Sequence, residues 1–205
     1  MDYIKLLNYI NPRRIVDIGA HVGDFTSDII RRAPECEIIM VEANKNCEPY
    51  LQKLNRGYEI LALSNRTGTA ELFVEKANAL GTGASLYREN TEWYADGKFE
   101  KVEVELDTLD NRSYFSDEVI DLVKLDVQGS ELDILQGGRK TIMRSHYVLM
   151  EVSLTQYNEK APLIDSIVPV MKEYGFCIED ILHYAKLPNN QIFQMDLLFK
   201  NIYIY

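Results

Sequence analysis

The stretch Ile15–Thr26, IVDIGAHVGDFT, joins an apolar run to a turn that contains two glycines. An apolar run, then glycines, then a helical pattern is typical of the first strand, turn and helix of a βαβ unit. Gly19 and Gly23 give the turn free backbone dihedrals and leave no side chain between the backbone and a ligand. The acidic residue Asp17 stands two positions before the first glycine, so the turn predicts a ligand that tolerates a nearby carboxylate.

The alternation of apolar runs and helical patterns continues along the chain. It predicts strands at 14–20, 37–43, 58–64, 101–106, 121–127 and 147–154, and helices at 25–32, 49–55, 131–143 and 163–174. Continuous apolar runs suit strands that are covered on both faces. The last two runs, 175–182 and 195–205, have a short polar link and predict an antiparallel strand pair. We therefore expect a doubly wound, Rossmann-like α/β fold with a mostly parallel sheet.

Three segments lie outside this alternation. Residues 69–75 follow the turn signal Thr67-Gly68 and predict a hairpin-like extension. Residues 78–98 show no periodicity, and their aromatic side chains fit either a loop that stacks on a sugar or a plain surface excursion; these aromatics are Tyr87, Trp93 and Tyr94. Residues 1–13 predict a short amphipathic helix that stops before Pro12 rather than a secretory signal. We expect one domain over residues 1–205.

The composition narrows the class of protein. The chain has 205 residues, 46% of them hydrophobic and 26% charged, as in an ordinary globular protein. The net charge of -10 and the lack of a Lys/Arg block argue against a nucleic-acid partner. No apolar run approaches the length of a membrane span. The three cysteines have no C-x-x-C spacing, so we expect reduced thiols and a cytoplasmic protein.

The pattern around Asp17 distinguishes between two classes of cofactor. A dinucleotide fingerprint is G-x-G-x-x-G, whereas this chain has D-x-G-x-x-x-G, and a carboxylate beside the turn would repel a pyrophosphate. S-adenosylmethionine has a sulfonium and an ammonium against a single carboxylate, so it suits an acidic turn. Glu42, at the end of the second predicted strand, can accept hydrogen bonds from ribose hydroxyls. A nicotinamide-dependent oxidoreductase and a non-catalytic cofactor-binding or scaffold protein are the alternatives.

These motifs resemble the FkbM family of class I S-adenosylmethionine-dependent methyltransferases. The matching segments follow the family order over residues 14–154: IVDIGAHVGDFT, MVEANKNCEPYLQKL, ALSNRTGTAELFV, VELDTLDN and IDLVKLDVQGSELDILQGG. The last segment is the most specific, because few other families follow the fourth strand with D-V-x-G-x-E and a helix that ends in Gly-Gly. The chain departs from the family at His21, where Asn is more common, and at Gln128, where an acid is more common.

The resemblance implies O-methyl transfer to a hydroxyl, commonly on a sugar, a glycan or a polyketide-like natural product. The expected partner is thus a sugar, a glycan or another small hydroxylated acceptor, with neither nucleic acid nor a membrane involved. The amino-group methyltransferases of nucleic acids carry N/D-P-P-Y/F where this chain has DVQG. The cofactor-binding residues that the resemblance implies are Asp17, Gly19, Ala20, His21, Gly23, Glu42, Ala43, Asn44, Ser64 and Asn65. Ala43 and Asn44 would border the ribose and adenine, and Ser64 and Asn65 the other face of the adenine.

Four residues are candidates for the catalytic chemistry. Asp126 follows an apolar strand and begins a glycine-containing turn, so it is the favoured general base. Glu151 interrupts the apolar run YVLMEVSL, and an acid in a buried strand needs a reason. Glu131 falls near the first turn of a helix, where the helix dipole also favours an acid. His21 is the rival base, because an imidazole suits proton abstraction at neutral pH.

The three acids also suggest a metal. Asp126, Glu131 and Glu151 could together bind Mg²⁺ or Ca²⁺, or could hold sugar hydroxyls. Since Gln128 replaces an acid at this point, direct proton abstraction is favoured over a divalent cation.

Overall fold

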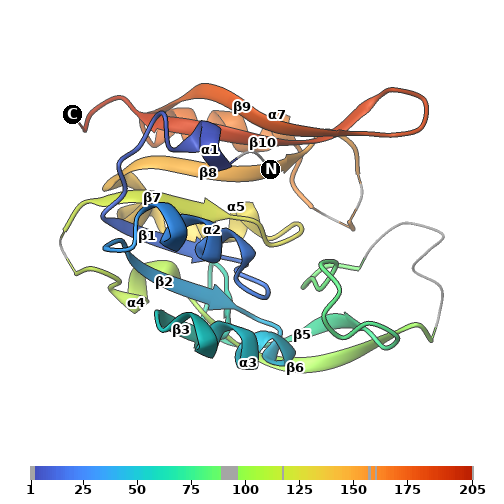
Figure 1. Cartoon of the computed structure of the whole chain (residues 1–205). Coiled ribbons are helices and arrows are strands. Elements are labelled where there is room, and N and C mark those ends of the chain that lie inside the picture. Colours follow the sequence, from blue (N-terminus) through green and yellow to red (C-terminus); the bar gives the residue numbers. More distant parts are fainter. Residues whose placement is uncertain (1–2, 89–96, 117, 157, 160, 205) are drawn as a thin grey trace.

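The computed structural model describes residues 3–88, 97–116, 118–156, 158–159 and 161–204. Within them lie a seven-stranded sheet in the order β3-β2-β1-β7-β8-β10-β9 and a three-stranded sheet in the order β4-β6-β5 (Figure 1). The strands are β1 Arg14–Ile18, β2 Glu37–Glu42, β3 Gly57–Ile60, β4 Ala62–Leu63, β5 Gly68–Glu75, β6 Phe99–Asp107, β7 Ile120–Leu125, β8 Ser145–Ser153, β9 Phe176–Lys186 and β10 Ile192–Asn201. The helices are α1 Tyr3–Leu6, α2 Asp24–Arg32, α3 Glu48–Leu51 with the 3₁₀ turns Lys45–Cys47 and Gln52–Leu54 on either side, α4 Leu109–Arg112, α5 Glu131–Gly137, α6 Arg139–Met143 and α7 Ile164–Glu173.

The large sheet confirms the predicted topology. Its strands from β3 to β8 pair in parallel, and β10 is antiparallel to both β8 and β9. The strand order reverses between β1 and β7, because the chain runs outward from β1 to β3 and returns on the other side of β1 as β7. In open sheets of this kind, ligands bind beyond the carboxyl ends of the strands at such a reversal. The predicted doubly wound sheet with an antiparallel C-terminal pair is therefore confirmed.

Two hydrophobic cores cover the two faces of the large sheet. One core joins alternate strand residues to α4, α5, α6 and α7, and the other joins the remaining strand residues to α1, α2 and α3 (Figure 1). Side chains alternate between the faces of a strand, so Val16 and Ile18 of β1 enter the first core while Ile15 enters the second. Asp17 consequently points to the face that α2 covers, where Thr26 of that helix donates a hydrogen bond to it.

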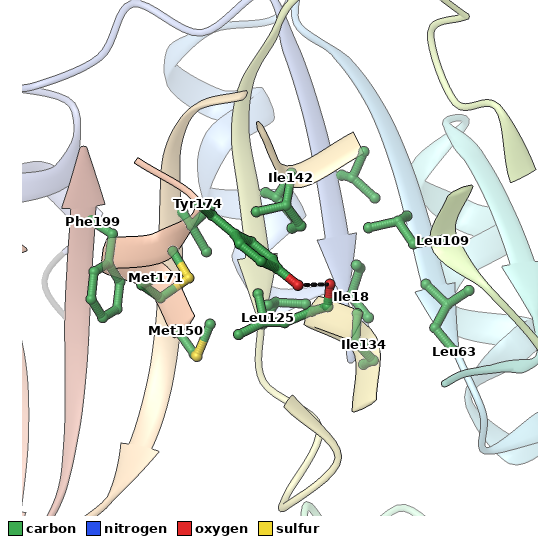
Figure 2. Packing of buried hydrophobic residues seen from close by; sticks show 14 of the residues in the cluster. Ile18, Leu63, Leu109, Leu125, Ile134, Ile142, Met150, Met171, Tyr174 and Phe199 are labelled. Carbon is green, nitrogen blue, oxygen red and sulfur yellow. Dashed lines mark hydrogen bonds between the residues drawn. The ribbon is translucent and has the colours of Figure 1, made fainter. Parts of the chain in front are cut away.

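The first core also fixes how α5 and α7 sit on the sheet. Tyr174 follows α7 and donates a hydrogen bond from its hydroxyl to the Leu135 carbonyl oxygen at 3.2 Å (Figure 2). Around this contact lie apolar side chains from β1, β7, β8 and the helices, among them Ile18, Leu125 and Met171. Because Ile18 and Leu125 end β1 and β7 at the reversal point, the core supports the turns that follow these two strands.

The run 58–64, predicted as a single strand, is divided in the structure. Residues Gly57–Ile60 form β3 in the large sheet, whereas Ala62–Leu63 form β4, which pairs in parallel with β6. The predicted hairpin at Thr67-Gly68 is wrong, because β5 pairs antiparallel with β6, which lies beyond residues 76–98. Both differences have one cause: strand partners distant in sequence decide which sheet a residue joins.

The helix predicted over 131–143 is also divided, at Gly138. A Cβ atom on Gly137 would lie 2.1 Å from the Ser64 carbonyl oxygen, so this helix end approaches the backbone after β4 too closely for a side chain. The Asp110 carboxylate then accepts hydrogen bonds from the backbone N–H groups of Lys140 and Thr141, which begins α6 as a separate helix. The N-terminal helix α1 is likewise shorter than the 1–13 that the sequence predicts.

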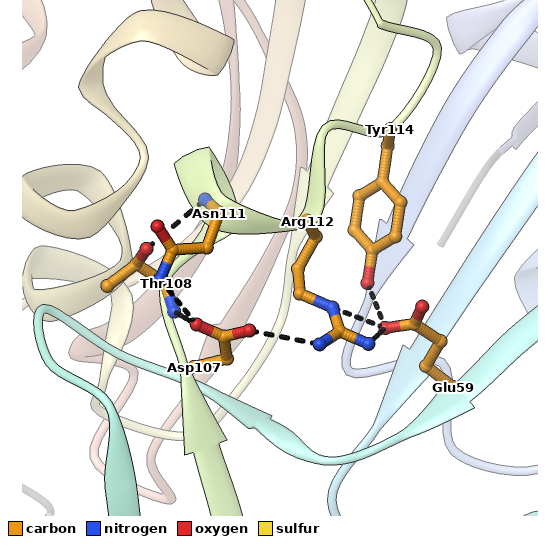
Figure 3. Close-up of polar contacts among 6 residues, drawn as sticks. All are labelled: Glu59, Asp107, Thr108, Asn111, Arg112 and Tyr114. Carbon is orange, nitrogen blue, oxygen red and sulfur yellow. Dashed lines mark hydrogen bonds and ion pairs between the residues drawn. The ribbon is translucent and has the colours of Figure 1, made fainter.

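An ionic network attaches the small sheet to the large one (Figure 3). Arg112 of α4 donates from Nε to Glu59 of β3 at 2.8 Å and from Nη1 to Asp107 at the end of β6 at 3.0 Å. Tyr114 adds a 2.6 Å hydrogen bond to the same Glu59 carboxylate. The hydrogen bonds to Asp107 and Glu59 raise the pKa of Arg112 above its ordinary value. This network holds β4 beside the carboxyl ends of β2 and β3. None of the described helices has both the length and the apolarity that crossing a bilayer requires.

Candidate active site

A cavity of about 640 Å³ opens at the strand reversal. This volume is typical of small-molecule sites, which span roughly 300–1,000 Å³. Its wall contains the turn after β1, the end of β2, β4, the segment 78–86 and the turn after β7. Five of the predicted cofactor residues line it, namely Gly19, His21, Glu42, Ala43 and Asn44, as do Asp126 and Glu151 of the predicted catalytic residues.

The turn after β1 leaves no room for a side chain at its first glycine. Gly19 has a φ of 75°, and a Cβ atom there would lie 1.8 Å from the Asp126 carbonyl oxygen. Gly23 has a φ of 85°, but the atom nearest to a Cβ there is Leu54 Cδ1 at 2.4 Å. The first glycine therefore brings bare backbone to the cavity, while the second makes room for core packing and, like Ala20, is not in the cavity wall.

Glu42 holds the backbone of the cofactor turn in place. Its Oε2 accepts a 2.7 Å hydrogen bond from the His21 N–H, and its Oε1 accepts another at 2.7 Å from the Asn44 N–H. Burial raises the pKa of Glu42, and these two N–H donors partly offset that rise. A carboxylate that is fixed on the cavity wall in this way has two oxygens with which to accept further hydrogen bonds.

Asp17 lies behind the turn rather than in the cavity wall. Its carboxylate is fully buried, accepts a 2.7 Å hydrogen bond from Thr26 Oγ1, and has Lys124 Nζ 3.3 Å from Oδ1. The direct cofactor contact expected for Asp17 thus stays a prediction, and the contacts that it makes are those of a supporting residue.

Lys124 is a site residue that the sequence analysis missed. Its Nζ lies 3.2 Å from the Gly19 carbonyl oxygen, 3.3 Å from Asp17 Oδ1 and 3.4 Å from Asp126 Oδ2. The side chain is only 4% exposed, and its residue pairs directly with Asp17 across β1 and β7. The signal in the sequence was a lysine inside the apolar strand DLVKLDV, since a buried ammonium requires charged partners.

The structure brings Asp126 and Glu151 together. Both lie on the cavity wall, and the Gln128 side-chain amide donates to Glu151 Oε1 at 2.7 Å and to Asp126 Oδ1 at 3.3 Å. Gln128 holds a φ of 58°, in the left-handed region that residues other than glycine seldom adopt. Burial and the charge of Asp126 raise the pKa of Glu151 to about 9. At neutral pH Glu151 therefore carries a proton.

Glu131 turns away from this pair. Its Oε1 accepts a 3.0 Å hydrogen bond from the Gly129 N–H, and the side chain is buried outside the cavity wall. Burial raises the pKa of Glu131 to about 7. The described residues contain no group of three His, Cys, Asp or Glu side chains arranged to hold a metal ion.

His21 is engaged on the segment that covers the cavity. Its Nε2 lies 2.7 Å from the Leu80 carbonyl oxygen, and a carbonyl only accepts, so Nε2 carries the hydrogen and donates. The Asn44 side chain donates to the neighbouring Ala79 carbonyl at 2.7 Å. Through these contacts His21 and Asn44 hold the segment 78–86 against the cavity. The role of His21 as the rival base stays a prediction.

Ser64 and Asn65 are not in the cavity wall, where Leu61, Ala62 and Leu63 provide apolar surface instead. The Asn65 side chain donates outside the wall, to Asp133 and Gln136 of α5.

Of the three aromatic residues in the long loop, the structure describes only Tyr87. Tyr87 donates to Asp133 at 2.6 Å and stands outside the main cavity, whereas Trp93 and Tyr94 lie outside the described residues.

A comparison with known families matches residues 17–178 to the methyltransferase FkbM domain. The chain belongs to the FkbM methyltransferase family. The match runs from β1 into β9 and covers all of the cavity wall except Phe193 and Gln194. This membership confirms the resemblance found in the sequence and makes the protein an S-adenosylmethionine-dependent methyltransferase.

The chain is also similar to individual methyltransferases. The chain is 29% identical over 195 residues to the methyltransferase sdnD of Sordaria araneosa, a match that covers 80% of this chain and 73% of that protein. It resembles the structure of methyltransferase FkbM from Methylobacillus flagellatus, with a TM-score of 0.57 and 14% identity over 91% of this chain and 43% of that one. It also resembles M. capricolum TrmK in complex with S-adenosyl-homocysteine, with a TM-score of 0.53 and 8% identity over 98% and 69% of the two chains. The two structures show a shared fold, and the chain spans less than half of the Methylobacillus protein.

The cavity of this FkbM family member fits the cofactor. Gly19 presents bare backbone, Glu42 presents a fixed carboxylate, and Leu61 to Leu63 supply an apolar wall for a base. The residues that would hold S-adenosylmethionine are therefore Gly19, His21, Glu42, Ala43 and Asn44, with Asp17 and Lys124 supporting them from behind.

Proposed function

We propose that the protein transfers the methyl group of S-adenosylmethionine to a hydroxyl of a sugar or glycan, with Asp126 as the general base. One observation carries the proposal: the Asp126 carboxylate stands on the cavity wall at the end of β7, between Lys124 Nζ at 3.4 Å and the Gln128 amide at 3.3 Å. A base that is positioned from two sides and open to a cavity suits the removal of a proton from an acceptor hydroxyl.

The residues divide the work in the proposed reaction. The bound cofactor supplies a methyl group on a sulfonium, which needs an acceptor oxygen aligned with the sulfur–carbon bond. Asp126 accepts the hydroxyl proton as the oxygen–carbon bond forms and the sulfur–carbon bond breaks. Lys124 pairs with Asp126 and holds it in place, and Gln128 holds the protonated Glu151 beside it as a hydrogen-bond donor for the acceptor.

A divalent cation on Asp126, Glu131 and Glu151 is the alternative mechanism for the same reaction. The Glu131 carboxylate is occupied by the backbone of its own turn, so this donor set favours Asp126 acting directly on the acceptor. We expect methyl transfer to persist in EDTA. Loss of transfer in EDTA and its recovery with Mg²⁺ would establish the metal mechanism instead.

The test of the proposal separates binding from chemistry. Calorimetry measures the affinity for S-adenosyl-homocysteine, and transfer of a radiolabelled methyl group is measured on a panel of glycans, glycosides and hydroxylated natural products. Asp126→Asn should lower turnover by about 10²–10⁴-fold while the affinity for S-adenosyl-homocysteine stays within about threefold of wild type. The exposed Asp24→Asn exchange in α2 is the matched control and should change neither value. Unchanged turnover in Asp126→Asn would disprove the assigned base.

A further inference from the structure

The wall of the cavity carries carboxyl groups on several sides. Among the described residues that line it, four have carboxyl groups and none is Lys or Arg; the four are Glu42, Glu75, Asp126 and Glu151. Lys124 is buried behind the wall, with its ammonium beside Asp17 and Asp126, and does not line the cavity. An incoming ligand therefore meets acidic side chains without a basic partner among these residues.

The part of the wall on the β7, β8 and β10 side of the cofactor turn is made by Asp126, Gln128, Glu151 and Gln194, which we call the acceptor end. Asp196 lies behind it, directly opposite Glu151 in the register of β8 and β10. The basic side chains beside these acids already have partners: Lys124 pairs with Asp126 and Asp17, and the His183 ring lies 3.4 Å from Asp196. The acceptor end is thus a low-dielectric region with an excess of acids.

The raised pKa of Glu151 indicates that this region disfavours a second negative charge. The pKa of Glu151 is raised to about 9, first by burial and then by the charges of Asp126, Asp196 and Glu131. Asp196 behaves alike, because burial and the charge of Asp126 raise its pKa to about 6. A region in which the carboxyl groups of the protein take up protons disfavours the carboxylate or phosphate of a ligand for the same physical reason.

We propose that the acceptor has no phosphate, sulfate or carboxylate group around the hydroxyl that is methylated, so that it is a neutral polyhydroxylated sugar or an amine-bearing one. This inference rests on the proposed function and narrows its substrate class. Uronic acids and sugar phosphates are excluded when the anion adjoins the reacting hydroxyl. At about 6 Å and an effective dielectric constant of about 20, one repulsive pair of charges weakens binding on the order of 100-fold.

The test uses probes that can be designed although the natural acceptor is not known. In three analogues of S-adenosyl-homocysteine, a nitrogen replaces the sulfur and carries an arm that enters the acceptor end. The arms are 3-hydroxypropyl, 2-carboxyethyl and 3-aminopropyl, and calorimetry gives the affinity of each. We expect the carboxylate arm to bind at least about tenfold more weakly than the hydroxyl arm, after allowance for screening by salt. The amine arm should bind as tightly as the hydroxyl arm or more tightly.

Variants then assign the discrimination to the wall. In Asp126→Asn the ratio between the hydroxyl and carboxylate arms should fall toward one, because the fixed negative charge is gone. Glu105→Gln removes a charge from the exposed side of β6 and should leave the ratio unchanged. Equal or tighter binding of the carboxylate arm to the wild type would overturn the inference, as would a ratio that Asp126→Asn does not alter. If S-adenosyl-homocysteine itself does not bind, the proposed function fails first, and the two failures are thereby distinguished.

Discussion

At the scale of single residues, the site depends on a balance between carboxyl groups and one buried lysine. Lys124 contacts the Gly19 carbonyl oxygen, Asp17 and Asp126 at once, so it links the cofactor turn to the proposed base. The Gln128 amide allows Asp126 and Glu151 to lie close together, because it donates to both. An acid at position 128 would instead add a third carboxyl group to the pair.

The titration of Glu151 predicts a stability effect. Its pKa of about 9 in the fold lies above the 4.5 of an unperturbed side chain. The fold therefore favours the protonated form, and this contribution to stability is lost as the pH rises from about 4.5 through 9. Because Gln imitates protonated Glu, we expect Glu151→Gln to be more stable than wild type by more than about 1 kcal/mol at pH 8. Urea unfolding at several pH values measures this difference.

The difference should shrink as the pH falls toward 4.5. Glu105→Gln on the surface of β6 is the control and should show no comparable trend. A wild type at least as stable as Glu151→Gln at pH 8 would contradict the assignment.

Gly19 predicts a steric effect at the cofactor turn. In Gly19→Ala the new Cβ would meet the Asp126 carbonyl oxygen at 1.8 Å, on a backbone whose φ of 75° already disfavours a side chain. We expect a loss of about 2 kcal/mol or more, measured as a lower melting temperature. Gly83→Ala is the matched control, because a Cβ there has no atom within 4 Å and its melting temperature should be unchanged. Equal melting temperatures for the two variants would show that the turn can move aside.

At the scale of elements, strand pairing and close packing positioned the site. The division of residues 57–63 between two sheets places Leu61, Ala62 and Leu63 on the cavity wall. The approach of Gly137 to the Ser64 carbonyl then fixes α5 beside β4. The apolar wall thus depends on how the small sheet is attached to the large one.

Arg112 links the two sheets through Glu59 and Asp107, so a substitution of Arg112 tests this attachment. In Arg112→Met the partly buried Glu59 and Asp107 lose their common partner, so we expect a stability loss of about 1–3 kcal/mol. Urea unfolding with a double-mutant cycle against Glu59→Gln would isolate the pairwise coupling. Arg31→Met removes an exposed ion pair with Asp28 in α2 and should cost less than about 0.5 kcal/mol. Similar losses in the two variants would mean that the network adds nothing beyond a surface pair.

At the scale of the whole molecule, the net charge of -10 predicts weak binding to nucleic acids. Such a net charge repels a phosphate backbone, whereas tight nucleic-acid binding needs basic side chains that neutralise phosphates and release counterions. We expect no retardation of a structured RNA in a gel at 150 mM salt and up to about 10 μM protein. A salt-dependent shift below that concentration would restore nucleic acid as an acceptor class. A purified acidic protein such as pepsin would serve as a negative control.

The sequence alone determined the doubly wound sheet, its antiparallel C-terminal pair and the class of cofactor. These properties follow from local signals: the apolar runs, the glycine turn at Gly19 and the acid at Glu42 are all visible within a few positions of the chain. Asp126 could be named for the same reason, because it ends an apolar strand. The helix boundary at Gly138 and the split of residues 57–63 could not, since each depends on a partner far away in sequence.

Only the tertiary structure decided which acidic side chains meet at the cavity. It put Asp126 beside Glu151, turned Glu131 back onto Gly129, and placed Asp17 behind the turn against Lys124. The physical reason is that charge and burial are properties of an environment that several strands build together. The register between β1 and β7 pairs Asp17 with Lys124, and no local pattern in either segment states that register.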